Sequence, residues 1–256
     1  MNAHHGVGPI WPAVLQKMSY PYHLYRLIKW KLGFCRRLRR HPPVFVFQMG
    51  KVSSRSIFEP LQKTYHGEVV HDHIFETDRM QGETRELRAY LHSSNPPEKL
   101  FVISLVREPI ARNISTFFAN HESYMDKACG QGGVKLDELK AMFLTKFPHE
   151  QPLTWFDERI KRYFDIDVYA TPFPDCGYAE YSRGNIALLV VRLELDDQLK
   201  SAVVGRFLDI PGFHVARANT TEETRCGALY SAFRKEVRFT PAFVDTFCNS
   251  KYFRHF

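Results

Sequence analysis

The sequence predicts an α/β fold in which a central parallel sheet is flanked by helices. Short apolar runs, typical of buried strands, alternate along the chain with segments whose apolar residues recur at helical spacing. This alternation favours a parallel sheet, because parallel strands need crossover connections between them. Of the 256 residues, 44% are hydrophobic, which is enough for one substantial core. We therefore expect a single domain at residues 44–256, preceded by an arm at residues 1–43.

The first part of this domain contains three expected strands. Val44–Met49 is β-branched and aromatic and lies between Pro43 and Gly50, as a buried strand would. Leu100–Val106 is a continuous apolar run that is soon followed by Pro109, a residue well suited to the first turn of a helix. The expected elements are a strand at Val44–Met49, a helix at Ser54–Tyr65, a strand at Glu68–Phe75, a helix at Thr84–His92, a strand at Leu100–Val106 and a helix at Arg107–Asn120.

The second part of the domain is expected to be mainly helical. Three glycines interrupt residues 121–151, which predicts an inserted segment. The aromatic residues near Trp155 recur at helical spacing and are expected in the core. The expected elements are helices at Leu136–Phe147 and Pro152–Phe164, a strand at Ile186–Leu193, and further helices separated by loops up to Phe256.

Composition excludes several classes of protein. Residues 1–43 carry eight basic residues and no acidic one, whereas the rest of the chain has 27 basic and 28 acidic residues. A nearly neutral body does not predict nucleic-acid binding by the fold. No apolar run reaches the roughly 18 residues of a membrane-spanning helix, and the start of the chain lacks the order of a secretory signal. Five scattered cysteines without C-x-x-C spacing argue against disulfides and zinc, so we expect a cytoplasmic protein.

The basic arm has two interpretations. Residues Tyr20–Arg40 mix aromatic and aliphatic side chains with the positive charges. A helix of this composition is typical of peripheral contact with an anionic membrane surface, here the inner membrane face. The alternative is a solvated arm that packs its aromatic residues on the domain. The sequence leaves both interpretations open, and it does not indicate the oligomeric state.

The turn after the first strand predicts an anion-binding site. Gly50 and Lys51 are followed by a run of serines and then by a helix, whose first N–H groups lack partners and carry partial positive charge. A kinase that uses this loop as a nucleoside-triphosphate P-loop for ATP is a further alternative, and two positions argue against it. Phe45 occupies the position of its first glycine, and Val52 replaces its magnesium-binding hydroxyl. A dinucleotide fingerprint is also missing.

A second anion site is expected after the strand Leu100–Val106. Arg107 stands at its carboxyl end and Ser115 lies two turns into the following helix, with Arg112 between them. A guanidinium and a hydroxyl can hold one phosphate from two sides. Two separated anion sites on one sheet edge predict a ligand with two separated anionic groups.

Both motifs resemble elements of a known family. The stretch "QMGKVSSRSI" is similar to the 5′-phosphosulfate-binding loop of sulfotransferases, and "LVREPIARNISTFF" is similar to their 3′-phosphate-binding element. Three later stretches, "PLTWFDERIKRYFDIDVYATPF", "LLVVRLE" and "NSKYFRHF", resemble a bacterial family of capsular polysaccharide synthesis proteins that shares the sulfotransferase fold. The resemblance covers roughly Val44–Phe256 and implies a P-loop-like sulfotransferase fold.

The resemblance implies a sulfotransferase that depends on 3′-phosphoadenosine 5′-phosphosulfate (PAPS) and needs no metal. The sulfuryl group would pass to a hydroxyl of a carbohydrate, either a capsular or other cell-surface glycan or a glycolipid. Lys51 would contact the bridging oxygen and the 5′-phosphate. The other implied nucleotide-binding residues are Gly50, Val52, Ser53, Ser54, Arg55, Ser56, Arg107, Ser115 and Asn219. A non-catalytic, nucleotide-binding capsule-assembly protein at the membrane surface is the alternative.

Sulfuryl transfer also needs a base for the acceptor proton. The stretch "EVVHDHIF" places His71 and His73 two residues apart, so in a strand both would project from one face and Asp72 from the other. Polysaccharide 2-O-sulfotransferases carry a similar H-x-H on a strand between the two nucleotide motifs. An imidazole, with an unperturbed pKa of about 6.5, is largely neutral at cellular pH. We expect His73 as the base with His71 assisting, and Glu76 as the substitute.

Overall fold

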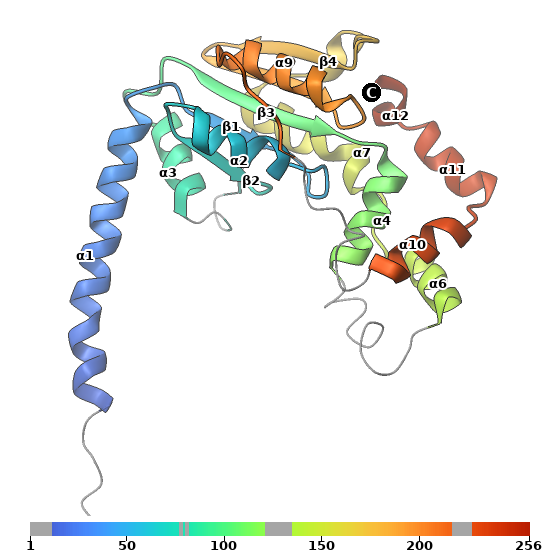
Figure 1. Ribbon diagram of the computed structural model, residues 1–256, viewed down its shortest axis with the longest axis horizontal. Coiled ribbons are helices and arrows are strands. Elements are labelled where there is room, and N and C mark those ends of the chain that lie inside the picture. Colours follow the sequence, from blue (N-terminus) through green and yellow to red (C-terminus); the bar gives the residue numbers. More distant parts are fainter. Residues whose placement is uncertain (1–11, 77–78, 80–81, 121–134, 217–226) are drawn as a thin grey trace, which may run out of the picture.

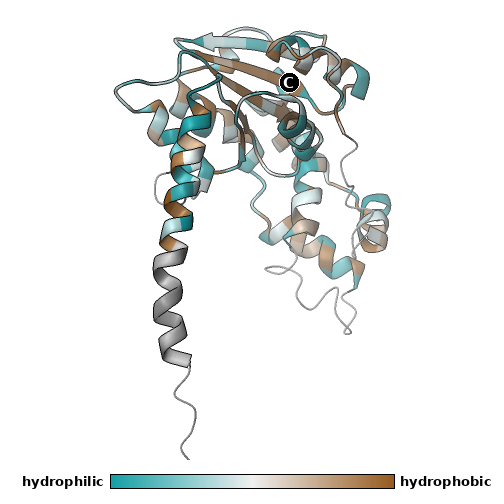
Figure 2. Cartoon of the chain, turned by 60° about the vertical axis from the view of Figure 1, so that its left-hand side comes forward, coloured by the Kyte–Doolittle hydropathy of each residue, from teal (hydrophilic) through white to brown (hydrophobic). Residues whose placement is uncertain are grey.

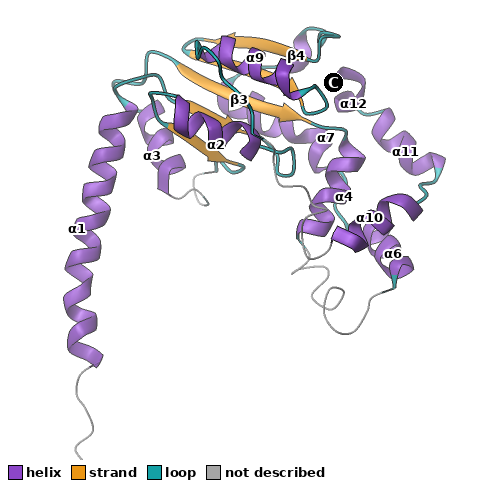
Figure 3. Ribbon diagram, in the orientation of Figure 1, coloured by secondary structure: helices purple, strands orange, loops and turns teal. Residues whose placement is uncertain are grey.

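The computed structural model describes residues 12–76, 79, 82–120, 135–216 and 227–256 (Figure 1). The strands are β1 (Val44–Phe47), β2 (Val69–Asp72), β3 (Leu100–Val106), β4 (Tyr178–Arg183) and β5 (Ile186–Arg192). The helices are α1 (Pro12–Leu38), α2 (Arg55–Thr64), α3 (Gly82–Leu91), α4 (Pro109–Ala119), α6 (Leu136–Lys146), α7 (Gln151–Trp155), α8 (Arg162–Phe164), α9 (Asp197–Leu208), α10 (Gly227–Glu236), α11 (Pro241–Cys248) and α12 (Lys251–His255). Figure 3 shows how these helices and strands are distributed.

Five strands form one sheet in the order β2-β1-β3-β5-β4. The first four are parallel, and β4 pairs antiparallel with β5 at one edge. In Figure 1, α2 and α9 lie in front of the sheet and α7 lies behind it. The predicted α/β class with a mostly parallel sheet is therefore confirmed. The strand that follows β1 in the chain, β2, lies on one side of the β1–β3 pair, whereas β4 and β5, which follow β3, lie on the other side. The connections therefore diverge between β1 and β3.

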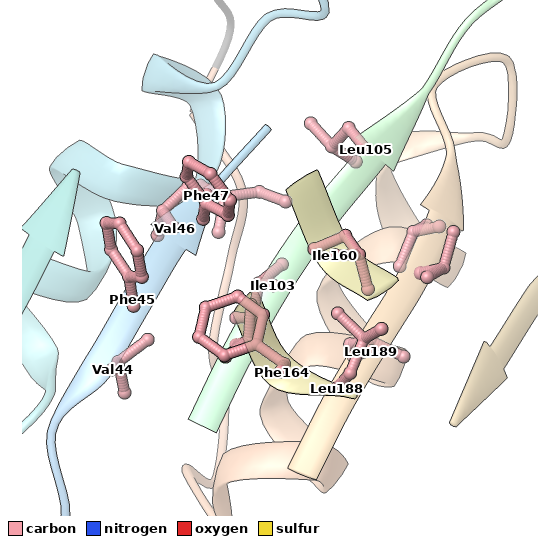
Figure 4. Close-up of a cluster of buried hydrophobic side chains, with 14 of the residues drawn as sticks. Val44, Phe45, Val46, Phe47, Ile103, Leu105, Ile160, Phe164, Leu188 and Leu189 are labelled. Atoms are coloured by element: carbon pink, nitrogen blue, oxygen red, sulfur yellow. The ribbon is translucent and has the colours of Figure 1, made fainter. Parts of the chain in front are cut away.

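The main core is rich in aromatic rings that pack against β1. The ring of Phe47 lies 4.8 Å from that of Phe45, 5.3 Å from that of Trp155 and 6.0 Å from that of Phe164. All four side chains are buried, and Figure 4 shows Phe45, Phe47 and Phe164 beside the apolar residues of β3 and β5. Central parallel strands are buried on both faces, which explains their continuous apolar sequences. The prediction that Trp155 and its neighbours belong to the core is confirmed.

A second, smaller aromatic cluster joins α4, α6, α10 and α11. Its centre is Phe143, whose ring lies 5.4 Å from that of Phe117 and 5.6 Å from that of Phe233. The buried members are Ile114, Phe117, Phe118, Leu139, Phe143, Phe147, Tyr230, Phe233 and Val237. This cluster fixes α4, the helix that follows β3, to the carboxyl-terminal part of the chain.

The second strand is shorter than the expected Glu68–Phe75. The carboxylate of Asp72 accepts the backbone N–H groups of His73 (2.7 Å) and Ile74 (3.1 Å). These side-chain hydrogen bonds replace the backbone hydrogen bonds to the neighbouring strand and turn the chain, so β2 ends at Asp72. The expectation that both histidines stand within one strand is therefore wrong, because His73 lies just beyond it.

Other boundaries also differ from the predictions. The sequence does not predict strand β4, because its residues YAEYSR contain no apolar run and the strand forms a largely exposed edge of the sheet. The helix expected at Pro152–Phe164 consists of α7, a π-helical segment at Phe156–Lys161, and α8. The first part of the expected insertion, residues 121–134, lies outside the described residues.

Helix α1 projects from the sheet (Figure 1), and of the part that Figure 2 shows in colour only the carboxyl end packs on the domain. Phe34 and Leu38 are buried in the main core, and Lys31 forms an ion pair of 2.9 Å with Glu86 of α3. The packed part of the chain therefore begins before Val44. Among the described residues, no helix combines the length and the apolar composition that crossing a bilayer requires.

The aromatic packing around β1 predicts a large effect of truncating Phe47. Phe47→Ala should lower the free energy of unfolding by about 3–5 kcal/mol, because it leaves a cavity among the rings of Phe45, Phe75, Trp155 and Phe164. Urea denaturation measures this change. Leu144→Ala is the control, because Leu144 is 39% exposed on α6 and its truncation should change stability by less than about 0.5 kcal/mol. Equal effects of the two substitutions would contradict the packing described here.

Candidate functional site

The carboxyl ends of the parallel strands bring the predicted site residues to one edge of the sheet. The loop after β1 carries Lys51, β2 leads into His73, and β3 ends immediately before Arg107. These ends flank the point between β1 and β3 where the connections diverge. Ligands of open α/β sheets bind in the crevice outside the carboxyl ends of the strands at such a point.

The two strands separate before β3 ends. The pairing of β1 with β3 stops at the pair Val46 and Ile103, although β3 continues beside β5. Gln48 fills part of the gap, because its side-chain oxygen accepts the backbone N–H of Leu105 at 3.1 Å. The Nε2 group of Gln48 is buried and has no hydrogen-bond partner among the described residues.

The loop between β1 and α2 has an unusual backbone. Lys51 (φ 70°) and Ser53 (φ 58°) both adopt the left-handed region, and Ser54 then enters the right-handed helical region. Neighbouring left- and right-handed residues turn successive N–H groups toward a common point, which forms an anion-binding nest. In the described part of the chain, no acceptor receives a hydrogen bond from the backbone N–H groups of residues 51–55. The loop therefore offers several free donors beside the positive end of α2.

Gly50 leaves open space at the base of this loop. No described atom beyond its chain neighbours lies within 4 Å of the position that a Cβ would take there. The packing of the described residues therefore does not require a glycine at this position. A molecule bound against the bare backbone would require one.

The loop itself carries the cation Lys51, and two arginines donate hydrogen bonds to its carbonyl groups. The Nη1 of Arg107 donates to the Lys51 carbonyl at 2.9 Å, and the Nε of Arg112 donates to the Gly50 carbonyl at 3.0 Å. The remaining guanidinium bonds of Arg112 go to Asn113 (3.1 Å) and to Gln151 of α7 (2.9 Å). All these acceptors are neutral.

These charges are not compensated within the described residues. No carboxylate there forms an ion pair with Lys51, Arg107 or Arg112, although the Arg112 side chain is fully buried. Burial, followed by the nearby charge of Arg107, lowers the pKa of Lys51. Burial is also the main cause that lowers the pKa of Arg112 to about 10. Buried charge without a counterion is unfavourable, so this site favours the binding of an anion.

The end of β3 is held by the carboxyl-terminal helix α12. The hydroxyl of Tyr252 accepts the backbone N–H of Arg107 at 3.1 Å and donates to the carbonyl of the same residue at 2.9 Å. Burial raises the pKa of Tyr252, so the hydroxyl keeps the proton that it donates. This pair of bonds fixes the backbone from which the Arg107 side chain extends.

The two histidines lie together although His73 is outside the strand. Their ring centroids are 5.0 Å apart, and the ring of His71 also contacts Phe58 of α2 at 4.9 Å. The Nδ1 of His73 lies 2.8 Å from the carbonyl oxygen of Gln48. Because a carbonyl can only accept, Nδ1 carries the proton, and in the neutral ring Nε2 is left as the proton acceptor. His73 therefore has the tautomer that a general base needs.

His71 differs from His73 in its environment. Burial is the main cause that lowers the pKa of His71 to about 4, with further lowering by His73 and Arg55 and an opposing effect of Asp72. Its Nε2 is buried and has no partner among the described residues. His71 is therefore neutral at physiological pH and adds no charge beside His73.

Some residues named by the resemblance do not present their side chains to the loop. Val52 is buried in the core, and the hydroxyl of Ser56 donates to the Ser53 carbonyl at 2.8 Å. Arg55 is exposed and lies 3.8 Å from Glu59 on the next turn of α2. Val52 and Arg55 can contribute to anion binding through their backbone N–H groups.

The remaining predicted residues lie further from the loop or cannot be placed. Ser115 is buried within α4, three residues after Arg112. Glu76, the substitute base, forms an ion pair with Arg159, so its carboxylate is already engaged by a guanidinium. Asn219 lies outside the described residues. In the part of the chain that is described, no group of three or more His, Cys, Asp or Glu side chains could hold a metal ion.

Sequence reasoning gave no role to Gln48, Arg112 or Tyr252. Arg112 is part of the quoted motif, but its partner Gly50 is 62 residues away in the chain. Tyr252 is 145 residues from Arg107. The only sequence signal for Gln48 is a polar residue directly after a buried apolar strand.

Comparison with known proteins gives one match. Residues 135–256, slightly less than half of the chain, match the model of a family described as "Putative capsular polysaccharide synthesis protein". The expected similarity to such proteins is confirmed for this segment, which includes Gln151 and Tyr252 but not Lys51 or Arg107. No curated protein and no solved structure matches the chain.

Proposed function

We propose that this protein is a PAPS-dependent carbohydrate sulfotransferase with a P-loop-like sulfotransferase fold. The observation that carries the proposal is the positive charge of Lys51, Arg107 and Arg112 near the carboxyl ends of β1 and β3, for which the described residues supply no counterion. This charge borders a loop whose backbone N–H groups have no acceptor among the described residues, and no described side chain fills the space over Gly50. A nucleotide with anionic groups at both ends of its ribose supplies the missing negative charge.

The two ends of the donor would be held by different elements. Lys51 and the N–H groups of residues 51–55 would hold the 5′-phosphosulfate, because they combine a full charge with convergent donors. Arg107 would hold the 3′-phosphate through the guanidinium N–H groups that Lys51 does not use. Ser115 is buried in α4, so the proposal assigns the 3′-phosphate mainly to Arg107. Arg112 positions the loop through the Gly50 carbonyl and does not contact the donor.

The proposed reaction is an in-line displacement at sulfur. The acceptor oxygen forms a bond to sulfur while the bond between sulfur and the bridging phosphate oxygen breaks. The proton of the acceptor hydroxyl passes to the Nε2 of His73, and Lys51 stabilises the negative charge that develops on the phosphate oxygen. Adenosine 3′,5′-bisphosphate leaves as the second product. Neutral His71 beside His73 avoids a second positive charge when His73 takes up this proton.

The family match favours a carbohydrate as the acceptor. Capsule synthesis provides sugar hydroxyls on glycans and on lipid-linked glycans, and either could accept a sulfuryl group. The alternative, a nucleotide-binding assembly protein without catalysis, shares the donor site and differs only in turnover. Measurements of binding and of turnover therefore distinguish the two.

The space over Gly50 predicts that a single methyl group interferes with nucleotide binding. Gly50→Ala should fold with unchanged stability, because its Cβ meets no described atom. It should weaken the binding of adenosine 3′,5′-bisphosphate at least tenfold, or by about 1.4 kcal/mol, because the ligand lies against the bare backbone. Lys51→Ala should weaken binding further, because it removes a charge. Isothermal titration calorimetry with and without magnesium measures both, and magnesium should have no effect.

Gly33→Ala is the matched control for this experiment. Gly33 lies on α1, and its added Cβ would make only an ordinary contact of 3.5 Å with Arg37. This variant should bind the nucleotide as the wild type does. Full affinity in Gly50→Ala would place the ligand elsewhere and refute the proposed donor site.

The tautomer of His73 predicts a separation of binding from turnover. His73→Ala should lower sulfuryl transfer from labelled PAPS to glycan acceptors by about 10²–10⁴-fold, because it removes the general base. The affinity for adenosine 3′,5′-bisphosphate should stay within about twofold of the wild-type value, or about 0.4 kcal/mol. Wild-type protein that binds the nucleotide but transfers no sulfate to any acceptor would favour the assembly-protein alternative.

The low pKa of His71 predicts that stability falls in acid. Its pKa is near 6.5 in the unfolded chain and about 4 in the folded protein. Between these values the unfolded state binds more protons, so the free energy of unfolding falls as the pH decreases. We expect His71 to contribute about 1–2 kcal/mol of this loss, since the side chain is only partly buried. Urea denaturation at pH 7 and pH 4 should show a smaller loss in His71→Gln.

His92→Gln is the control for the pH measurement, because His92 is exposed on the surface after α3. This variant should lose as much stability as the wild type between the two pH values. The lowered pKa values of His149 and His255 contribute in the same direction and remain in every variant. A loss in His71→Gln equal to that of the wild type would contradict the neutral state of His71.

A further inference from the structure

Exposed apolar side chains are concentrated on α1. Among the described residues, seven large hydrophobic side chains are exposed, and five of them belong to this helix. They are Leu24, Tyr25, Leu27, Ile28 and Leu32, with exposed fractions between 48% and 67%. Single exposed apolar residues are normal on protein surfaces, but a contiguous group marks an interaction site.

The exposed residues form an ordered face. Leu24, Ile28 and Leu32 follow one another at intervals of four residues, so they form one line along the helix, and Tyr25 borders this line. Leu27 lies on the same side of the helix as the buried Phe34 and Leu38, which follow it by seven and eleven residues, and this side adjoins the line. The apolar face is therefore wider than the part that the domain covers. Figure 2 shows brown segments alternating with teal ones along the projecting helix.

Basic residues share the helix with this face. Lys29 and Lys31 are exposed between the apolar positions, and further exposed arginines follow from Arg36 to Arg40. Two of these cations are paired with the domain, Lys31 with Glu86 and Arg37 with Glu68. Residues 1–43 contain no Asp or Glu, so α1 carries no negative charge of its own.

We propose that the projecting part of α1 lies on the surface of a bilayer that contains anionic phospholipids. Its apolar line enters the boundary between headgroups and acyl chains, while its lysines and arginines contact the headgroup phosphates. The charge argues against a second copy of this chain as the partner. Two α1 helices side by side would bring together two segments with eight basic residues each and no acidic residue. The proposal is independent of the sulfotransferase function.

Co-sedimentation of the full-length protein with vesicles tests this proposal. Wild-type protein should bind vesicles of phosphatidylcholine mixed with phosphatidylglycerol, and binding should weaken without phosphatidylglycerol or at high salt. The triple variant Leu24→Ser, Ile28→Ser, Leu32→Ser should lower the partition coefficient at least tenfold. Lys29→Gln should lower it about fivefold, the loss expected for one charge near the membrane surface.

Matched controls separate membrane binding from general changes in hydrophobicity and charge. Leu144→Ser removes an exposed apolar residue from α6, and Lys63→Gln removes an exposed charge from α2. Both should bind vesicles as the wild type does. Equal sedimentation of the wild type and the triple variant would overturn the proposal. A wild-type dimer in light scattering that the triple variant converts to a monomer, without vesicle binding by either, would also overturn it and assign this face to a second copy.

Discussion

The buried guanidinium of Arg112 is the constraint on which the candidate site depends. It holds the Gly50 carbonyl, Asn113 and Gln151, and so joins the loop after β1, helix α4 and helix α7 through one side chain. All three acceptors are neutral, so the positive charge remains uncompensated within the described residues. A buried charge is unfavourable unless it has a counterion nearby. The same group therefore sets the shape of the loop and gives the crevice its preference for anions.

The topology of the sheet places this charge beside the loop after β1. Strand β1 separates from β3 after the pair Val46 and Ile103, and Gln48 satisfies the N–H group that the separation leaves unpaired. The segment that matches the capsular polysaccharide synthesis family contributes Gln151 and Tyr252, which form hydrogen bonds with Arg112 and Arg107 of the site. Lys51 and Arg107 precede that segment. The family match therefore bears on the context of the protein and on the acceptor, and the proposed donor rests on the residues of the crevice alone.

Much of the fold could be predicted because local sequence determines it. The strand Leu100–Val106 was predicted at its observed bounds, since a strand buried on both faces is apolar throughout. Strand β2 ended early because one side chain, Asp72, captured two backbone N–H groups, and strand β4 has no apolar run to reveal it. The gathering of Lys51, His73 and Arg107 at one edge followed from the parallel order. The roles of Arg112 and Tyr252 could not be predicted, because their partners are brought near only by folding.

The connection between α1 and the sheet makes the two proposals relevant to each other. Only five residues separate Leu38 from Val44, and two of them are prolines. Arg37 is paired with Glu68, and the hydroxyl of Tyr65 donates to the Pro42 carbonyl at 2.5 Å, so this connection is held at both ends. A helix fixed in this way transmits its orientation to the sheet, unlike a helix on a flexible linker. A bilayer bound by α1 would therefore hold the carboxyl edge of the sheet at a constant orientation. Such an arrangement favours an acceptor that is itself anchored in the membrane, because the proposed donor site and the acceptor would then both be held at the same membrane surface.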